Sequence, residues 1–141
     1  MSWQTPKTDW KIEYDSSGSY TGDYFNATDY QRIKGNLLVL QTLAGELYPA
    51  ITLPAIPDVT TSSWGLAGTL NALERSLDAL AAGMYDPGIA ARKTWAADQP
   101  AMTYADLNRI ESSCLALYNV LTQQAACRPK LAINLGLREV G

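Results

Sequence analysis

The chain has 141 residues, of which 47% are hydrophobic and only 18% are charged, with a formal net charge of −3. This length suits a single domain, and the small acidic charge argues against the basic face with which proteins bind nucleic acid. Because an average protein is about 25% charged, so low a fraction favours burial of part of the surface in an assembly.

The sequence also carries no pattern for membrane insertion. No apolar run approaches the ~18 residues that a membrane span needs, and residues 1–25 lack the continuous apolar core of a signal peptide. We therefore expect one domain over residues 1–141, made in the cytoplasm and without a membrane partner. Cys114 falls on the apolar face of an expected helix and Cys127 lies too far along that helix to reach it, which predicts two free thiols.

Residues 1–25 form an aromatic arm. Trp10, Ile12 and Tyr14 alternate with charged residues, which predicts a short strand with one apolar face. The arm is too short for a core of its own. Its aromatic side chains therefore pack on the helices or on a neighbouring subunit, or they form an exposed surface on which sugars stack.

Residues 26–48 have the pattern of a capped amphipathic helix. Asn26 is a favourable N-cap, and Asp29 stands where its carboxylate can bond back to the helix start. Apolar residues then recur at spacings of three and four, at Tyr30, Ile33, Leu37, Leu40, Ala44 and Leu47. Gly35 and Gly45 indicate close approach of another backbone, and Pro49 ends the helix.

A second helix is expected over residues 64–84, after a proline-containing extended connection. Its stripe is Leu66, Leu70, Leu73, Leu77, Leu80 and Met84. This stripe packs either inside the chain or against copies around a symmetry axis, and the spacing fits both arrangements.

The third helix is expected over residues 103–126, with Thr103 as cap and Asp106 in the third position. Pro129 should close it. From residue 130 to residue 140 the apolar period changes to two, which predicts a C-terminal strand. Such a strand must pair, either with residues 10–14 or with the sheet edge of a partner.

The first and third helices begin with the same unit. Asn26, Asp29 and Arg32 correspond to Thr103, Asp106 and Arg109, and each set follows a Lys-Thr-(Asp)-Trp segment, at residues 7–10 and 93–95. We interpret the unit as a loop locked onto a helix start, with the tryptophan covering the first turn. The two arginines form either ion pairs within the unit or contacts between subunits.

The paired pattern "KTDW … DYQRIK" and "KTW … YADLNRIE", with the closing "RPKLAINLGLREVG", resembles proteins of phage and prophage tail modules from Gram-positive gut bacteria. Those are small virion components, such as baseplate or tail-fibre proteins and the attachment domains of longer fibres. The resemblance covers both ends of the chain but not the middle helix. It implies an oligomeric structural role, often with three-fold or six-fold symmetry, and it implies no catalytic residues.

Catalytic patterns are weak. The chain has no histidine, which removes the commonest general base and the commonest zinc ligand. Its carboxylates read as turn or cap residues, and its glycines form no phosphate-binding loop. We therefore expect neither an enzyme nor a cofactor.

Together these patterns predict a mainly α fold: three helices in an antiparallel bundle or hairpin, a duplicated loop–helix unit and a small terminal β element. The expected function is a virion structural protein of the tail tip, baseplate or tail fibre. It would bind copies of itself, as a trimer or hexamer, and neighbouring virion proteins. Two further functions fit the sequence: a head-fibre, decoration or neck protein, and a carbohydrate-binding module that recognises a host surface glycan. The candidate contact residues, each of which can equally be core, are Trp3, Trp10, Tyr14, Trp64, Leu135 and Leu137.

Overall fold

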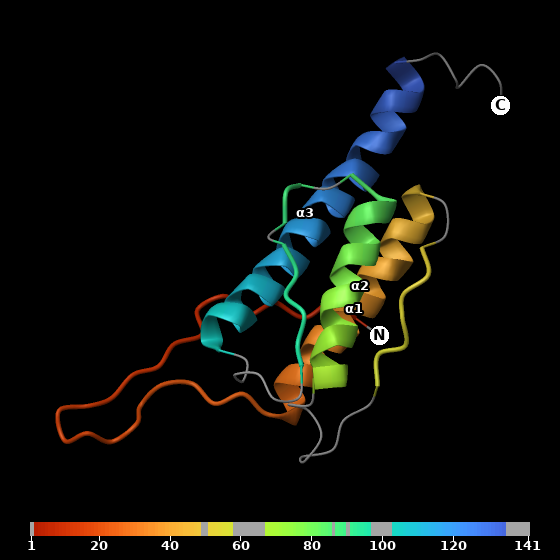
Figure 1. Ribbon diagram of the computed structural model, residues 1–141. Helices are drawn as coiled ribbons and strands as arrows, with labels where there is room; N and C mark the ends of the chain where they lie inside the picture. Colours follow the sequence, from red (N-terminus) through yellow and green to blue (C-terminus); the bar gives the residue numbers. More distant parts are fainter. Residues whose placement is uncertain are drawn as a thin grey trace.

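The computed structural model is mainly helical and contains three helices over its described residues, in agreement with the expected fold class (Figure 1). The helices are α1 (Ala27–Leu47), α2 (Ala67–Gly83) and α3 (Tyr104–Asn134). The structure describes residues 2–48, 51–57, 67–85, 87–89, 91–96 and 103–134, with backbone alone for residues 67 and 128–134.

The three helices run in the same direction, so the expected antiparallel arrangement is wrong (Figure 1). Ion pairs join the N-terminal parts, between Arg32 of α1 and Glu111 of α3 and between Arg109 of α3 and Glu74 of α2. At the other end, Tyr48 just after α1 donates a hydrogen bond to Gln124 of α3. Each connection has roughly 20 residues, long enough in extended form to return along a helix of similar residue count.

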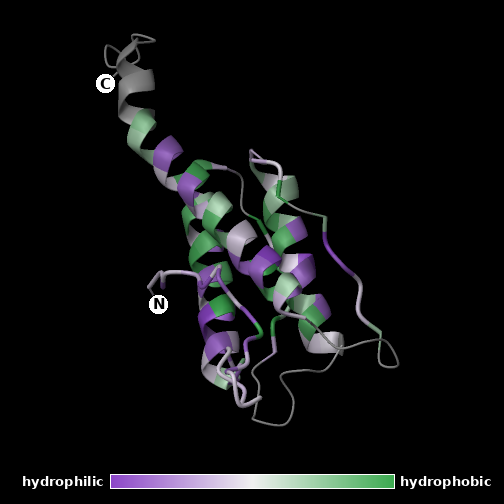
Figure 2. Cartoon of the chain, turned by 90° about the vertical axis from the view of Figure 1, so that its left-hand side faces the viewer, coloured by the Kyte–Doolittle hydropathy of each residue, from purple (hydrophilic) through white to green (hydrophobic). Residues whose placement is uncertain are grey.

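The core lies between the helices and is built from the apolar stripes predicted from spacing. In Figure 2 hydrophobic residues recur along all three helices. The fully or nearly fully buried side chains at equivalent heights are Tyr30, Ile33, Leu37 and Leu40 on α1, Leu70, Leu73, Leu77 and Leu80 on α2, and Leu107, Ile110, Cys114 and Leu117 on α3. Cys114 is thus a core residue, and both it and the exposed Cys127 are free thiols.

Helix α1 begins with the predicted capping box. The Asn26 side chain accepts hydrogen bonds from the backbone N–H groups of Thr28 and Asp29, and the Asp29 carboxylate accepts from the Asn26 N–H. These bonds satisfy donors that a helix start leaves unpaired. The close backbone approach expected at Gly45 is wrong, because a Cβ there would meet no neighbouring atom within 4 Å.

Helix α3 runs past the proline that was expected to close it. It continues through Pro129 to Asn134, so residues 130–134 of the predicted C-terminal strand are helical instead. A proline removes one N–H donor from a helix, and the remaining backbone bonds carry the helix across it. Alternation over so few residues does not distinguish a strand from a helix. Residues 135–140, including Leu135 and Leu137, lie outside the described residues.

The strand predicted at residues 10–14 forms only an isolated antiparallel bridge, between Tyr14 and Tyr20. Backbone hydrogen bonds from Thr21 to Glu13 and from Asp23 to Lys11 nevertheless hold residues 11–24 as a narrow hairpin. We call residues 11–24 the tyrosine hairpin. It projects from the end of the bundle where the helices begin (Figure 1).

Candidate functional site

The segment before the tyrosine hairpin lies along α1 and α3 and is held by asparagine side chains. Asn36 of α1 donates to the Gln4 carbonyl and accepts from the Gln4 N–H, at 2.7 and 2.9 Å. Asn108 of α3 holds Trp10 in the same two-way manner, at 3.0 and 2.7 Å. The backbone N–H and C=O groups of this extended segment therefore bond to side chains of the helices, where a second strand would otherwise be needed to pair them.

A buried carboxylate completes this attachment. Glu111 of α3 is only 1% exposed and accepts from the Lys7 backbone N–H at 3.0 Å and from the Trp10 indole N–H at 2.5 Å. Arg32 binds both oxygens of Glu111, at 2.9 and 2.7 Å, and also binds Asp29 at 2.7 Å. A buried carboxylate is tolerated where a guanidinium and hydrogen bonds offset its lost hydration.

The second Lys-Thr-Trp segment is attached to α2 by the same set of groups. Asn71 accepts from the Trp95 N–H at 2.7 Å and donates to its carbonyl at 2.8 Å. Glu74, fully buried, accepts from the Lys93 backbone N–H and from Arg109 at 2.6 Å. We call Asn108 with Glu111, and Asn71 with Glu74, the two Asn–Glu clamps. The clamps differ at the indole, because Trp95 Nε1 has no hydrogen-bond partner among the described residues.

Sequence reasoning found the two segments and the two arginines but missed the clamps that hold them. Asn71 and Glu74 stand three residues apart on α2, as Asn108 and Glu111 do on α3. The same register on α1 carries Gln31 and Lys34. The shared asparagine–glutamate spacing, beside matched apolar stripes, is the signal that could have identified α2 as a third, diverged copy of the repeated helix.

The candidate contact residues differ in their burial. Trp10 is 4% exposed and belongs to the core, while Trp3 stacks on Tyr118 with ring centroids 3.9 Å apart. Tyr14 is 62% exposed on the tyrosine hairpin. Trp64, Leu135 and Leu137 lie outside the part of the chain that the structure describes.

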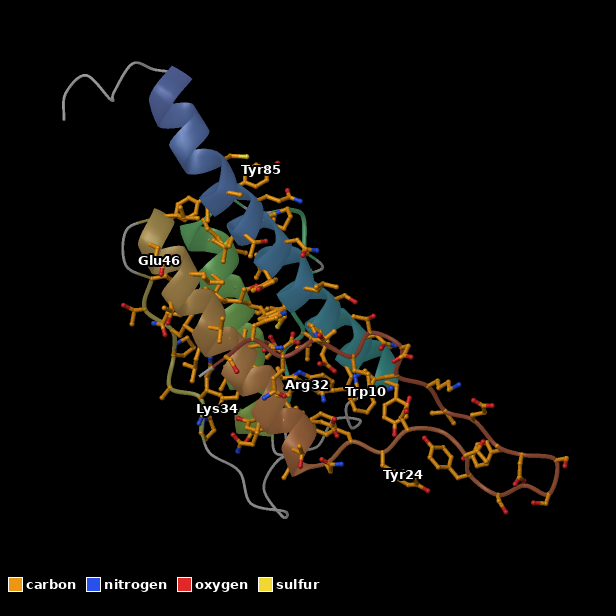
Figure 3. The ribbon with its side chains drawn as sticks, turned by 180° about the vertical axis from the view of Figure 1, so that it is seen from behind. Trp10, Tyr24, Arg32, Lys34, Glu46 and Tyr85 are labelled. Carbon is orange, nitrogen blue, oxygen red and sulfur yellow. The ribbon has the colours of Figure 1, made fainter. Side chains whose placement is uncertain are left out.

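The tyrosine hairpin exposes three large apolar side chains. Ile12, Tyr14 and Tyr24 are 67%, 62% and 70% exposed, and Figure 3 shows the Tyr24 ring beside the hairpin and clear of the helices. Tyr20 lies between Tyr14 and Tyr24 and meets each ring edge to face, at centroid distances of 5.3 and 5.0 Å. Such contacts order the rings without covering them.

Hydrogen bonds and ion pairs hold the hairpin at its base. The Asp23 carboxylate accepts from the Lys11 N–H at 2.9 Å and pairs with Lys7 at 3.3 Å. The Asp23 carbonyl accepts from the hydroxyls of Tyr20 and of Tyr104 on α3. Desolvation and the Tyr104 hydroxyl raise the pKa of Tyr20 from its usual 10 to about 12.

The tip of the hairpin is ordered by one carboxylate. Asp15 accepts from the N–H and hydroxyl of Ser17 and from the N–H of Ser19, and these bonds lower the pKa of Asp15. Gly18 adopts a φ of 86°, which favours glycine. The hairpin is therefore a shaped projection with exposed aromatic rings, the kind of surface that enters protein or sugar interfaces.

A second apolar feature lies on α1. Leu38, Val39, Thr42 and Leu43 line an open hollow of about 510 Å³ in the second half of the helix. Apart from Thr42 these side chains are partly exposed, and none belongs to the fully buried stripe. The hollow and the tyrosine hairpin are the two candidate interaction surfaces.

Metal-binding clusters and membrane-spanning helices are both absent from the described part of the chain. It contains no group of three or more histidine, cysteine, aspartate or glutamate side chains placed to share a metal ion. None of the helices, over the described residues, combines the length and apolarity needed to cross a bilayer. No family model, curated protein or solved structure matches the chain.

Proposed function

We propose that this chain is a non-enzymatic structural protein of a phage virion, placed at the tail tip, baseplate or tail fibre, which assembles with copies of itself and with neighbouring virion proteins. The observation that carries the assembly role is the tyrosine hairpin. It is fixed at its base and tip, and it presents Ile12, Tyr14 and Tyr24 to solvent. Large apolar side chains held in this way are typical of interaction sites.

The roles of the motif residues support the same proposal. The Lys-Thr-(Asp)-Trp segments and the Asp–Arg pairs, which carry the resemblance to phage tail proteins, bind one another and the Asn–Glu clamps. They act inside the chain as determinants of a rigid body. A rigid body with one projecting contact element suits a structural component, because little order is lost when the contact forms.

The location is tested on particles purified from the bacterial strain whose genome encodes the chain. Mass spectrometry of those virions should detect the protein, and gold-labelled antibodies against it should mark the tail end in electron micrographs. Labelling of the head or neck would instead favour a head-fibre, decoration or neck protein. Intact infectious particles that lack the chain would overturn a virion role.

A second candidate function is recognition of a host surface glycan, and the exposed Tyr14 and Tyr24 rings favour it. Stacked sugars need accessible aromatic faces. The full chain should then bind wall polysaccharide purified from the host, with the affinity reduced at least ~10-fold by Tyr24→Ser. Tyr85→Ser is the matched control, because Tyr85 is 63% exposed at the opposite end of the bundle. Equal binding by both variants would place the sugar elsewhere, and no binding would remove this candidate.

A further inference from the structure

We propose that two copies of this chain exchange residues 3–10, so that the segment of each copy occupies the Asn108–Glu111 clamp of the other. The exchange opens the tyrosine hairpin at its turn, residues 15–19, and the two hairpins become one two-stranded ribbon between two bundles. This exchange rests on the assembly role proposed above. It identifies a second copy as the partner and the clamp as its binding site.

The contacts that hold the segment depend on the segment alone. Asn36 bonds to both backbone groups of Gln4. Asn108 bonds to both backbone groups of Trp10, and Glu111 accepts from the Trp10 indole N–H. None of these bonds involves the hairpin that joins the segment to α1. The same segment from a second copy therefore makes the same bonds, which is the condition for exchange at low cost.

The two strands of the tyrosine hairpin keep their pairing when they come from different copies. Residues 20–24 stay with their own bundle, because the Asp23 carbonyl accepts from the Tyr104 hydroxyl of α3. Residues 11–14 follow the exchanged segment and pair with residues 20–24 of the other copy. The hydrogen bonds of Asp23 with the Lys11 backbone are then remade between copies.

The turn at residues 15–19 is the part of the hairpin that changes. It is exposed throughout, and hydrogen bonds from Ser17 and Ser19 to Asp15 hold it. Such exposed bonds contribute little to stability, because water replaces them. Gly18 has a φ of 86°, which belongs to the reversal of the chain. The exchanged chain passes straight on, so this conformation is no longer required.

The hairpin is longer than the connection requires, and it leads away from the bundle. The link from Trp95 to the Thr103 cap has seven residues between its ends, whereas the equivalent link from Trp10 to Asn26 has fifteen. Fully extended, residues 11–24 span about 45 Å. Because the hairpin projects beyond the start of the helices (Figure 1), a second bundle fits at the far end of the ribbon without colliding with the first.

Protein concentration decides which form is populated. A segment tethered beside its own clamp has an effective concentration on the order of millimolar, so dilute chains keep their own segments. Copies held side by side in an assembly reach similar concentrations. Exchange then joins them through contacts that each chain already contains.

Refolding of mixed cysteine variants tests the exchange. In a Cys127→Ser background, which leaves only the buried Cys114, one preparation carries Trp3→Cys and the other Tyr118→Cys, because these two rings stack. The two are combined in urea and refolded at about 1 mM, the scale of the effective concentration. A short bifunctional thiol reagent should then link them into dimers. Each preparation refolded alone should stay unlinked, and circular dichroism establishes that both are folded.

Two glycines of the same conformation provide a matched pair of variants. Gly18→Val strains the closed turn, and exchange relieves that strain in both copies, so the dissociation constant of the dimer should fall at least ~10-fold. Gly88→Val is the control, because Gly88 has a φ of 89° and open space for a Cβ but lies outside the exchanged region. Its dissociation constant should match that of the wild type. Light scattering over a concentration series measures both constants.

The other outcomes separate the exchange from the proposed function. No cross-link between folded variants at the higher concentration would overturn the exchange, and so would equal dissociation constants for the two glycine variants. If the cysteine variants do not fold, the glycine pair decides alone. A wild type that is oligomeric without these signatures would preserve self-assembly through another surface. The location in the virion is judged separately on purified particles.

Discussion

At the scale of single residues, two buried glutamates organise the attachments of the extended segments. Glu111 and Glu74 each accept from a backbone N–H and from an arginine. A buried ion pair adds little net stability when it is compared with apolar residues of the same volume, but removing one partner leaves the other charge poorly solvated. The clamps therefore matter most for specifying where the segments lie.

Substitution of Glu111 by alanine should destabilise the chain by about 3–5 kcal/mol, because it leaves the Lys7 N–H and the Trp10 indole N–H without their acceptor and leaves Arg32 with Asp29 alone. Urea denaturation followed by circular dichroism measures the loss. Asp78→Ala is the matched control, since Asp78 forms an exposed ion pair with Arg92, and it should cost less than about 1 kcal/mol. Similar losses in the two variants would contradict the role given to Glu111.

The carboxyl of Asp106 makes stability depend on pH. Burial raises its pKa, but hydrogen bonds from Thr103 and the nearby Lys93 outweigh burial and lower the pKa below its usual 3.8. A carboxyl with a lower pKa in the folded state stabilises that state above the unfolded pKa, and this contribution disappears as the pH falls through the folded pKa. The capping carboxylate thus contributes stability at neutral pH.

Asp106→Asn should accordingly flatten the acid branch of the stability curve. The free energy of unfolding, measured by urea titration at a series of pH values below about 5, should fall less steeply in the variant than in the wild type. Parallel curves for the two proteins would show that Asp106 has the same proton affinity in the folded and unfolded chain.

At the scale of elements, the chain contains one helix pattern in three versions. All three helices bury the same register of apolar positions, and α2 and α3 both carry an Asn–Glu clamp. On α1 the equivalent positions hold Gln31 and Lys34, and on α2 the position of Arg32 and Arg109 is Ala72. Glu111 of α3 meets Arg32 of α1, and Glu74 of α2 meets Arg109 of α3, so the same arrangement would set Lys34 of α1 against position 72 of α2. Because position 72 is alanine, two cations do not meet there.

The two clamps should act independently on their own segments. Asn108→Ala removes both hydrogen bonds to the Trp10 backbone and should speed amide hydrogen exchange in residues 7–14, while Asn71→Ala should do so in residues 91–96. Each loss should cost about 1–3 kcal/mol. Each variant serves as the control for the other, and exchange that rises equally in both segments would show that they are released together.

At the scale of the whole molecule, the helices share one core and none is independent. A helix of 17 to 21 residues gains most of its stability from packing, and here buried apolar residues from all three helices and Trp10 belong to a single cluster. Removal of any helix would expose the stripes of the other two.

Unfolding should therefore be a single cooperative transition. Urea curves from the circular dichroism of the helices and from tryptophan fluorescence, to which the buried Trp10 and Trp95 contribute, should coincide, as two-state unfolding requires. An earlier fluorescence transition would show that the extended segments detach before the helices unfold.

The sequence by itself determined the features that depend on neighbours in the chain. Helix stripes and the Asn26–Asp29 and Thr103–Asp106 caps involve residues three or four apart, so their spacing is visible without a structure. The duplication of the Lys-Thr-Trp segments is visible as well, because each segment is a short run of neighbouring residues. The sequence does not reveal that residues 130–134 continue α3, because a few alternating residues do not distinguish a strand from a helix.

Only the tertiary structure decided how these elements meet. The partners of Glu111 include Lys7 and Arg32, which lie 104 and 79 residues away in the sequence, and no local spacing indicates such a pairing. The parallel direction of the helices depends on the path of two long connections, which the apolar stripes do not specify. The tyrosine hairpin is exposed for the same reason: its alternating pattern is compatible with burial, and only the position of its base on α3 directs it away from the core.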